Sequence, residues 1–288
     1  MATIKEYNLK LRSLKNTQKI TRTMKMVSAS KLRKAQMAQA NSKVYAQNIR
    51  QLISRIAASV DRSSHALLAS RSPVKNILIL LFTSDKGLCG AFNHNVHRQV
   101  LQWIKEHQKD YEQIHLSCCG RRGFMYFHKK AQVKNYYEDM TLNPSFQNAI
   151  KIGKDLAAGY IAGQYDEVYV THNQFFSPLS QKTTFEKILP IDPQAIFAQD
   201  MRVSTDYMFE PEQDELLQFL IPDYLYFRIY FTLLENSAGE HGARMTAMDS
   251  ATNNASDMIS RYTLLRNRAR QAEITTELIE IIAGAEAL

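Results

Sequence analysis

The sequence predicts an α/β fold with long terminal helices: an antiparallel two-helix coiled coil from the N- and C-terminal segments, with a Rossmann-like parallel-sheet domain inserted between them. The first observation behind this prediction is a shortage of helix breakers. The 288 residues include only 10 Gly and 7 Pro, where average usage would give about 35 together. The second is their placement, because none falls at 1–72 or at 243–283. The third is that strand-like and helix-like stretches alternate in the region between, as they do in α/β domains.

The N-terminal segment, residues 1–72, is predicted to be the first long helix of the coiled coil. Its apolar side chains recur three or four positions apart, which is the spacing of one helix face. They are Ile4, Tyr7, Leu11 and Leu14, followed by Ile20, Met24 and Val27. The two groups are six residues apart, so we expect the apolar stripe to drift around the helix and not to form a strict heptad seam.

The middle segment, residues 73–206, is predicted to be the inserted α/β domain. Stretches typical of buried strands occur at 76–82, 113–119 and 167–175, and stretches typical of helices at 93–108 and 145–163. A weaker strand signal lies at 183–190. Strands that alternate with helices favour a parallel, doubly wound sheet.

The C-terminal segment, residues 207–288, is predicted to be the second long helix. Steps of three and four alternate along its seam, as in a heptad pattern. The seam consists of His241, Arg244, Met248, Ala251, Ala255, Met258, Tyr262, Leu265, Ala269, Ala272, Thr276, Ile279 and Ala283. A breaker-free helix over 243–283 would be ~60 Å long, about twice the width of a small domain. Such a helix has to project beyond any compact body.

Charge separates the two ends of the chain. Residues 1–72 hold 15 Lys and Arg against Glu6 and Asp61, a net charge of +13, whereas residues 207–288 hold 6 Arg and 13 acidic residues, a net charge of −7. Net charges of opposite sign at the two ends indicate either that the two segments lie against one another or that each meets a charged partner. Pairing along one coiled coil is the interpretation that we favour.

Composition excludes several classes of protein. Three cysteines, two of them adjacent, suit a reducing compartment and give no zinc-ligand spacing. No apolar run approaches the ~20 residues that cross a bilayer, so no transmembrane segment is expected. The first 36 residues are basic and nearly free of acids, as transit peptides are. Their helical pattern continues without a cleavage-like break, so we expect them to belong to the mature protein.

Signs of catalytic chemistry are weak. The loop from Thr83 to Gly90 follows a strand and precedes a helix, but it matches neither phosphate-binding glycine motif. His94 and His97 share a helix face without a third metal ligand nearby. We therefore expect no cofactor, no metal and no catalytic residue. A Rossmann-like enzyme that uses the loop at Gly87 stays open as an alternative.

A nucleic-acid-binding coiled coil is the second alternative, because the basic N-terminal helix could contact phosphates. Its segment offers only two aromatic residues, Tyr7 and Tyr45, for base stacking. A solvated or protein-facing helix side explains the same charges, and we expect no nucleic-acid partner.

The most informative stretch is the C-terminal tip. Four large apolar residues fall outside the seam there: Ile274, Leu278, Ile281 and Ile282. A helix that is apolar nearly all round must be covered on all sides, which one partner helix cannot do. The pattern predicts a sleeve of other chains, or else a tip that folds back on the α/β domain. Just before it, Arg270 and Gln271 point away from the seam, where they could hydrogen-bond to a surrounding partner.

Four stretches carry a resemblance to a known family. They are LKNTQKITRTMKMVSASKLRKAQ at 14–36, SDKGLCGAFN at 84–93, ARMTAMDSATNNASDMI at 243–259 and RARQAEITTELIEIIAGA at 268–285. In these the sequence resembles the gamma subunit of F-type ATP synthases, the central stalk of F1.

The resemblance implies a function and a set of partners. The terminal helices would form a rotor shaft inside the alpha3-beta3 hexamer, which couples transmembrane ion flow to ATP synthesis or hydrolysis. The α/β domain would sit outside, with the epsilon subunit and the c-ring. Nucleotide and catalysis would belong to other chains, so this chain would be a non-catalytic subunit. It would lie peripherally on the cytoplasmic side of a bacterial inner membrane.

The resemblance also implies contact residues. Arg270 and Gln271 match positions that catch a beta-subunit loop, and Ile274, Leu278, Ile281 and Ile282 would form an apolar bearing. Met24 and Arg244 match coupling positions at the neck of the shaft. Three positions depart from the family pattern, namely Glu273, Thr276 and Gly242, and the first of them adds a carboxylate beside the bearing.

Overall fold

The computed structural model describes residues 3–57, 65–192 and 213–286, and their side chains except at 43–47, 49–57, 213, 214 and 286. The elements in chain order are α1 (Ile4–Ala57), β1 (Asn76–Phe82), α2 (Phe92–His107), β2 (Gln113–Cys119), α3 (Arg121–Phe127), β3 (Val133–Tyr137), α4 (Phe146–Ile161), β4 (Glu167–Phe175), β5 (Gln181–Leu189) and α6 (Gln213–Glu286). They divide into two compact units: unit 1 contains Met1–Ala29 with Arg244–Leu288, and unit 2 contains Ser30–Ala243.

Unit 2 is built on a five-stranded sheet in the order β3-β2-β1-β4-β5. The pairs β1–β2, β1–β4 and β2–β3 are parallel, which confirms the predicted doubly wound core. The weak strand signal at 183–190 corresponds to β5, which pairs antiparallel with β4 as a hairpin. Helix α3 and strand β3 were not predicted from the sequence, because both are short and carry no long apolar run.

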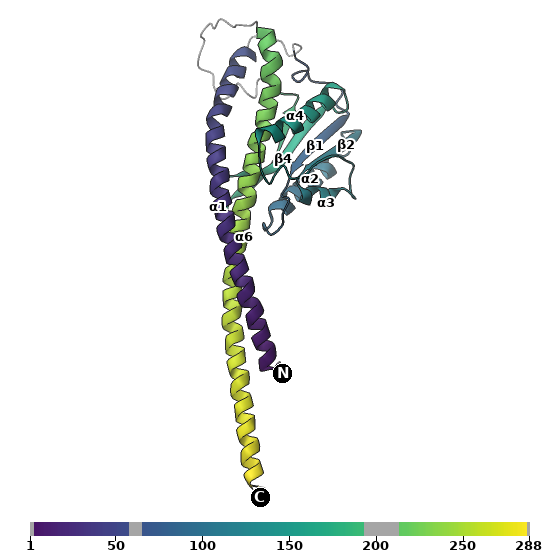
Figure 1. Cartoon of the computed structure of the whole chain (residues 1–288). Coiled ribbons are helices and arrows are strands. Elements are labelled where there is room, and N and C mark those ends of the chain that lie inside the picture. The colour runs from purple at the N-terminus through teal and green to yellow at the C-terminus, as the bar shows by residue number, and fades with distance from the viewer. Residues whose placement is uncertain (1–2, 58–64, 193–212, 287–288) are drawn as a thin grey trace. The chain divides into compact units, whose positions relative to one another are not determined.

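Strand β1 explains why the sheet is covered on both faces. Its run of apolar residues alternates between the two sides, because successive side chains of a strand point in opposite directions. Leu78, Leu80 and Phe82 pack with α4 and with the part of α6 that lies in unit 2. The residues between them pack with α2 and α3. Figure 1 shows α4 on one face of the sheet and α2 and α3 on the other.

The start of α4 and its contact with α6 position the helices on this face of the sheet. Ser145 caps α4, since its hydroxyl accepts a hydrogen bond from the backbone N–H of Asn148 at 3.2 Å. Gly153 lets α4 approach α6, because a methyl group there would overlap the ring of Tyr226. Helix α6 itself continues through Pro222. Packing of the apolar face of α6 outweighs the low helix propensity of proline.

The predicted division of the chain at 72/73 and 206/207 stays a prediction, and the second boundary lies outside the described residues. Both long helices are present, as predicted. Each contributes residues to both compact units.

Candidate functional site

The first candidate site is the seam between α1 and α6 in unit 1. Along α1 the less exposed side chains follow alternating steps of three and four, namely Ile4, Tyr7, Leu11, Leu14, Gln18, Thr21, Lys25 and Ser28. This is a regular heptad seam, so the predicted drift of the stripe is wrong. Ile20 and Val27, expected in the stripe, are 60% and 51% exposed. The seam passes instead through polar residues in its middle.

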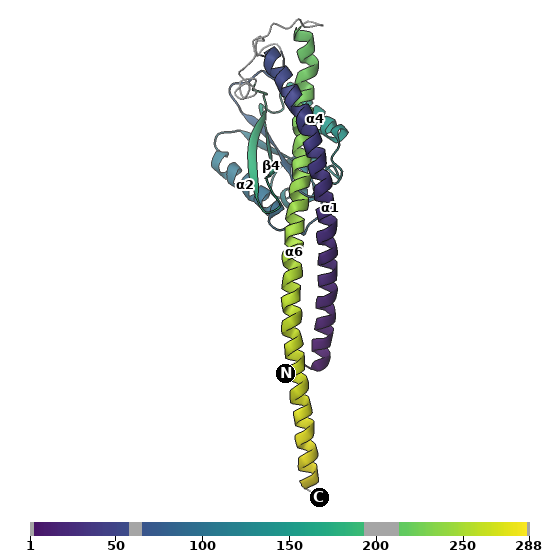
Figure 2. The ribbon, with the colours of Figure 1, turned by 90° about the vertical axis from the view of Figure 1, so that its left-hand side faces the viewer.

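Contacts along this seam confirm an antiparallel pair. The hydroxyl oxygens of Thr21 and Thr252 lie 2.8 Å apart, and Lys25 donates a hydrogen bond to a carboxylate oxygen of Asp249 at 2.5 Å. Nearer the N-terminus, the rings of Tyr7 and Tyr262 lie 6.3 Å apart. Residue numbers rise on α1 as they fall on α6, and Figures 1 and 2 show the two helices side by side.

The charges of the two helices mostly do not pair. Lys25 with Asp249 is the ion pair between α1 and α6 in the described part of unit 1, and both side chains are nearly half exposed. The other basic residues of α1 in this unit are exposed: Lys5, Lys10, Arg12, Lys15, Lys19 and Arg22. In the described part of unit 1, pairing along the coiled coil, as we favoured from the sequence, therefore accounts for one of the seven basic residues of α1. A charged partner is the remaining interpretation.

Within the described residues of unit 1, the tip of α6 has no partner helix. Figure 1 shows α6 continuing beyond the N-terminal end of α1. All the predicted contact residues of this stretch are exposed: Arg270, Gln271, Ile274, Leu278, Ile281 and Ile282. So is Ile279 of the predicted seam, at 60%. Within unit 1, no other described element covers these apolar side chains.

The two predicted neck residues differ in environment. Met24 is half-buried on α1, next to the polar middle of the seam. Arg244 is only 7% exposed, and it is the first residue of α6 in unit 1. A buried guanidinium is costly unless it is paired, and Arg244 does have interaction partners.

A second candidate site is the crevice at the carboxyl ends of β1 and β4. Strand order reverses between these two strands, and in open α/β sheets this is where ligands bind. Here α6 takes that place: Asn236 donates to the backbone oxygen of Thr83 at 3.3 Å, and a methyl group on Gly239 would come within 3.0 Å of Phe92. The crevice therefore holds a helix.

The loop after β1 is also occupied by its own residues. Ser84 accepts a hydrogen bond from Asn93 at 2.7 Å, and the two oxygens of Asp85 accept from the backbone of Arg121 and from the hydroxyl of Thr141. The groups that could cradle a phosphate are thus used to join β1, α2 and α3. The structure gives the Rossmann-like enzyme no support.

A buried polar junction joins both long helices to the sheet within unit 2. Glu235 of α6 lies 2.9 Å from the Nε2 atom of His172 on β4, and both side chains are less than a tenth exposed. Its other oxygen accepts a hydrogen bond from Gln39 of α1 at 3.4 Å. The hydroxyl of Thr184 on β5 lies 3.2 Å from Nδ1 of His172. We missed this junction in the sequence, where an acidic residue between Leu234 and Asn236 was its only signal.

The remaining polar candidates have structural roles. His97 is buried and stacks on Tyr126 at 4.3 Å between ring centroids. Burial, then the charges of His94 and Lys130, lower the pKa of His97 to about 4. The three cysteines are buried, and burial raises the pKa of Cys118 to about 12. Within the described residues, no group of three His, Cys, Asp or Glu side chains could hold a metal ion.

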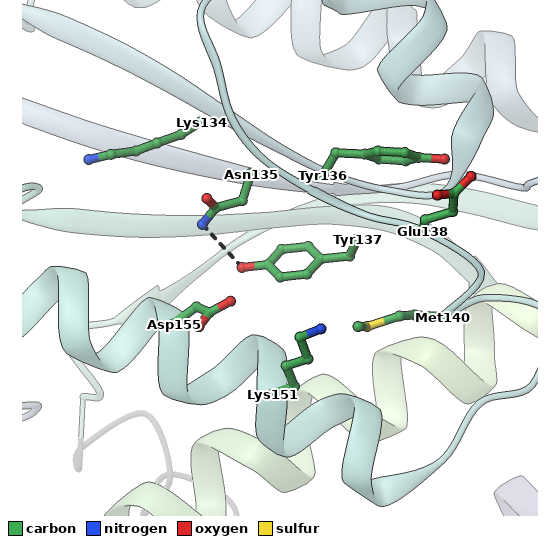
Figure 3. A pocket seen from close by; sticks show the side chains of 8 residues that line it. All are labelled: Lys134, Asn135, Tyr136, Tyr137, Glu138, Met140, Lys151 and Asp155. Carbon is green, nitrogen blue, oxygen red and sulfur yellow. Dashed lines mark hydrogen bonds between the residues drawn. The ribbon is translucent and has the colours of Figure 1, made fainter.

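One open pocket of about 390 Å³ lies between β3 and α4 (Figure 3). Its lining is Lys134, Asn135, Tyr136, Tyr137, Glu138, Met140, Lys151 and Asp155. Asn135 donates to the hydroxyl of Tyr137 at 3.3 Å, and Lys134 lies over the ring of Tyr165. The cationic and anionic side chains balance, and the lining contains no nucleophile paired with a base.

The fold and these sites define a class of protein: a coiled-coil shaft with an unpartnered apolar tip and an attached α/β domain. A sequence model of the ATP synthase family matches residues 3–288. The ATP synthase gamma chain of Trichlorobacter lovleyi is 42% identical over 288 residues, which cover 100% of this chain and 99% of that one. That of Bdellovibrio bacteriovorus is 41% identical over 296 residues, with the same coverage. The chain belongs to the ATP synthase gamma-chain family.

Solved structures show the same fold. A chain in the central stalk and c-ring structure of the Tetrahymena thermophila mitochondrial ATP synthase aligns with a TM-score of 0.61 at 25% identity, covering 81% of this chain and 99% of that one. A chain of the Euglena gracilis mitochondrial ATP synthase aligns with a TM-score of 0.66 at 19% identity, covering 99% and 94%. Among the described residues, no helix combines the length and apolar character that a membrane span requires.

Proposed function

We propose that this chain is the central rotor shaft of a rotary F-type ATP synthase, which couples transmembrane ion flow to ATP synthesis or hydrolysis in an alpha3-beta3 hexamer. The observation that carries the proposal is the tip of α6, where Ile274, Leu278, Ile279, Ile281 and Ile282 are between 45% and 68% exposed. A soluble chain rarely leaves such a continuous apolar stretch uncovered unless a partner covers it. A ring of subunits covers all sides of a helix, whereas one helix covers one side.

The physical role of the shaft follows from its asymmetry. A rod inside a pseudo-threefold ring makes different contacts with each surrounding subunit. A ligand or partner shifts a conformational equilibrium only through such differences in contact free energy. Rotation of the shaft would therefore pass each catalytic subunit in turn through states of different nucleotide affinity. Catalysis and nucleotide binding belong to those subunits, and this chain is non-catalytic.

Individual residues have assigned roles in this proposal. Ile274, Leu278, Ile281 and Ile282 form the apolar bearing. Arg270 and Gln271, both exposed, hydrogen-bond to a loop of a beta subunit. The unpaired basic face of α1 meets acidic groups of the ring, which explains why its charge is not balanced by α6.

Met24 and Arg244 couple shaft and ring at the neck. Unit 2 sits outside the ring with the epsilon subunit and the c-ring. This chain lies peripherally on the cytoplasmic side of a bacterial inner membrane, which agrees with the bacterial source of the relatives described above. The alternative of a nucleic-acid-binding coiled coil finds no support in the family or in the fold.

Co-purification from the native host tests the proposal. Tagged full-length chain should recover alpha, beta and epsilon subunits in one complex that hydrolyses ATP. A chain substituted at the bearing, Leu278→Asp with Ile282→Asp, should recover less alpha and beta because charge on the tip opposes burial. Recovery of no alpha, beta or epsilon chains from wild-type protein would refute the proposal.

A further inference from the structure

The hairpin between β4 and β5 carries an apolar surface that neither the shaft nor the sheet uses. Phe176 is 60% exposed and Leu179 is 85% exposed. They belong to a run without a charged residue, from Asn173 to Gln181, in a chain where 22% of residues are charged. We call Phe176 and Leu179 the knuckle.

The knuckle is rigid, because its turn is closed by hydrogen bonds. The backbone N–H groups of Phe176 and Ser177 both donate to the carbonyl oxygen of Ser180, at 3.3 and 3.0 Å. In return, the N–H of Ser180 donates to the carbonyl and hydroxyl oxygens of Ser177 at 3.2 and 3.0 Å. The two apolar side chains are therefore held outward on a fixed backbone.

The hairpin is also fixed to α6 within unit 2. Gln181 donates to the carbonyl oxygen of Gly239 at 2.9 Å. A methyl group on Gly242 would come within 3.2 Å of both Phe175 and Pro178, so the glycine allows close contact there. Where α6 turns, the knuckle must turn with it.

A third exposed apolar residue lies at the same edge of the sheet. Leu88 follows β1, and β1 and β4 are parallel neighbours, so the loops after them leave the sheet at the same edge. Leu88 is 63% exposed and has a φ of +63°. That conformation costs a residue with a Cβ about 1 kcal/mol. Backbone strain of this kind is concentrated at functional sites.

We propose that the knuckle is a sliding contact between this chain and the rim of the alpha-beta ring; this inference rests on the proposed function. Unit 1 begins at Arg244, two residues after Gly242 on the same uninterrupted helix. For a ring that encircles unit 1, the nearest surface of unit 2 along the chain is the one that contacts Gly242. That surface is the hairpin.

The chemistry of the knuckle suits a moving contact. Hydrogen bonds are directional and would have to break at each step of rotation. Apolar burial is non-directional and depends on area, so Phe176 and Leu179 can meet each subunit of a pseudo-threefold rim in turn. The occupant is thus an apolar patch that recurs around the ring.

Thiol labelling tests the contact in the assembled protein. The native cysteines are all buried, so Leu179→Cys places a single accessible thiol on the full chain. Ile161→Cys is the matched control. Ile161 is 56% exposed and ends α4, which places it at the opposite edge of the sheet, where β4 begins. Each variant is assembled with alpha and beta subunits alone, and its rate of reaction with a maleimide is compared with that of the free chain.

We expect assembly to slow labelling of Leu179→Cys at least about tenfold, because a covered thiol does not react, and to leave Ile161→Cys unchanged. Equal labelling of Leu179→Cys before and after assembly would overturn the contact while leaving the shaft function intact. Protection that appears only after the epsilon subunit is added would assign the knuckle to epsilon and would also overturn it. Failure of the wild-type chain to assemble would instead overturn the proposed function, and the contact with it.

A second variant pair measures what the contact contributes. Phe176→Ser with Leu179→Ser changes only exposed side chains. The double variant should leave the alpha-beta complex about five times faster on dilution, a loss of about 1 kcal/mol, because it removes apolar surface from the contact. Ile161→Ser should dissociate at the wild-type rate. Equal dissociation of the double variant and the control would count against the proposal.

Discussion

At the scale of single residues, burial decides which polar side chains contribute to holding the elements together. Glu235, His172 and Gln39 were not distinguished in the sequence from surface residues, yet the fold buries Glu235 and His172 and joins three elements at one carboxylate. His97 was considered as a metal ligand and is instead a buried aromatic neighbour of Tyr126. Two residues of one type spaced along a helix do not reveal which side of that helix the rest of the fold covers.

The junction at Glu235 should contribute to stability. Replacing Glu235 by Ala removes the partner of buried His172, and leaving a buried polar group unpaired costs about 1–3 kcal/mol. Urea unfolding of the full chain should show that loss, and a smaller one for Glu235→Gln, whose amide can still hydrogen-bond. Glu215→Ala, at an exposed position of the same helix, should unfold like the wild type. A junction without energetic value would make Glu235→Ala and Glu215→Ala indistinguishable.

His97 should make the chain less stable in mild acid. Its pKa is about 4 in the folded chain because burial disfavours the charged form, and it is 6.5 in the unfolded chain. Above pH ~6.5 the imidazole of His97 is neutral in both the folded and the unfolded chain, so its titration does not change the free energy of unfolding there. As the pH falls from 6.5 towards 4, the unfolded chain takes up a proton on His97 before the folded chain does. Up to about 3 kcal/mol of stability is therefore lost by pH ~4.

His97→Phe keeps a ring against Tyr126 and removes the titration. Between pH 6.5 and 4.5, its unfolding free energy should therefore fall by about 2 kcal/mol less than that of the wild type. His128→Phe, which changes an exposed histidine, serves as the control. Parallel losses in all three proteins would contradict the assignment.

At the scale of elements, the coiled coil has a polar middle. Thr21, Lys25 and Ser28 occupy successive seam positions of α1, where apolar residues would give a more stable pair. Polar residues at such positions set the register of two helices at a cost in stability. The middle of the seam is thus its weakest part.

Replacing both threonines should strengthen it. The double variant Thr21→Val with Thr252→Val substitutes an apolar contact for a hydroxyl pair, and such replacements are neutral or stabilising. We expect a gain of about 1 kcal/mol, measured as slower hydrogen exchange of the amides around both positions. Thr23→Val, on the exposed side of α1, should not change exchange there. Faster exchange in the double variant would show that the hydroxyl pair stabilises the seam.

Sequence patterns predicted the elements with strong periodicity and missed those without it. Strand β1 was found because both of its faces are buried, which requires a continuous apolar run. The edge strand β3 was missed because its sequence, VKNYY, is partly exposed. Ile20 and Val27 were assigned to the apolar stripe because they are apolar, but the described part of this chain leaves both of them exposed. The need of the tip for other chains was predicted because a helix that is apolar all round cannot be covered by one partner helix.

At the scale of the whole molecule, function requires partners, and the tip is where the requirement is greatest. Deleting 274–288 should leave unit 2 as stable as in the wild type, because the exposed tip side chains contribute nothing to its core. In the assembled enzyme, ATP-driven ion pumping should fall more than ATP hydrolysis. Leu264→Ser, which changes an exposed residue outside the tip, controls for loss of apolar surface. Unchanged pumping by the truncated chain would contradict the role of the tip as a bearing.

The change from two helices to one within unit 1 has a mechanical consequence. Two helices packed along a seam resist bending more strongly than one, because bending the pair stretches one helix and compresses the other. A single helix has no such partner and curves more easily. Thermal bending should therefore be greatest in the part of α6 beyond α1. A compliant end can centre itself inside a socket that is not perfectly round, while the paired part behind it transmits torsion.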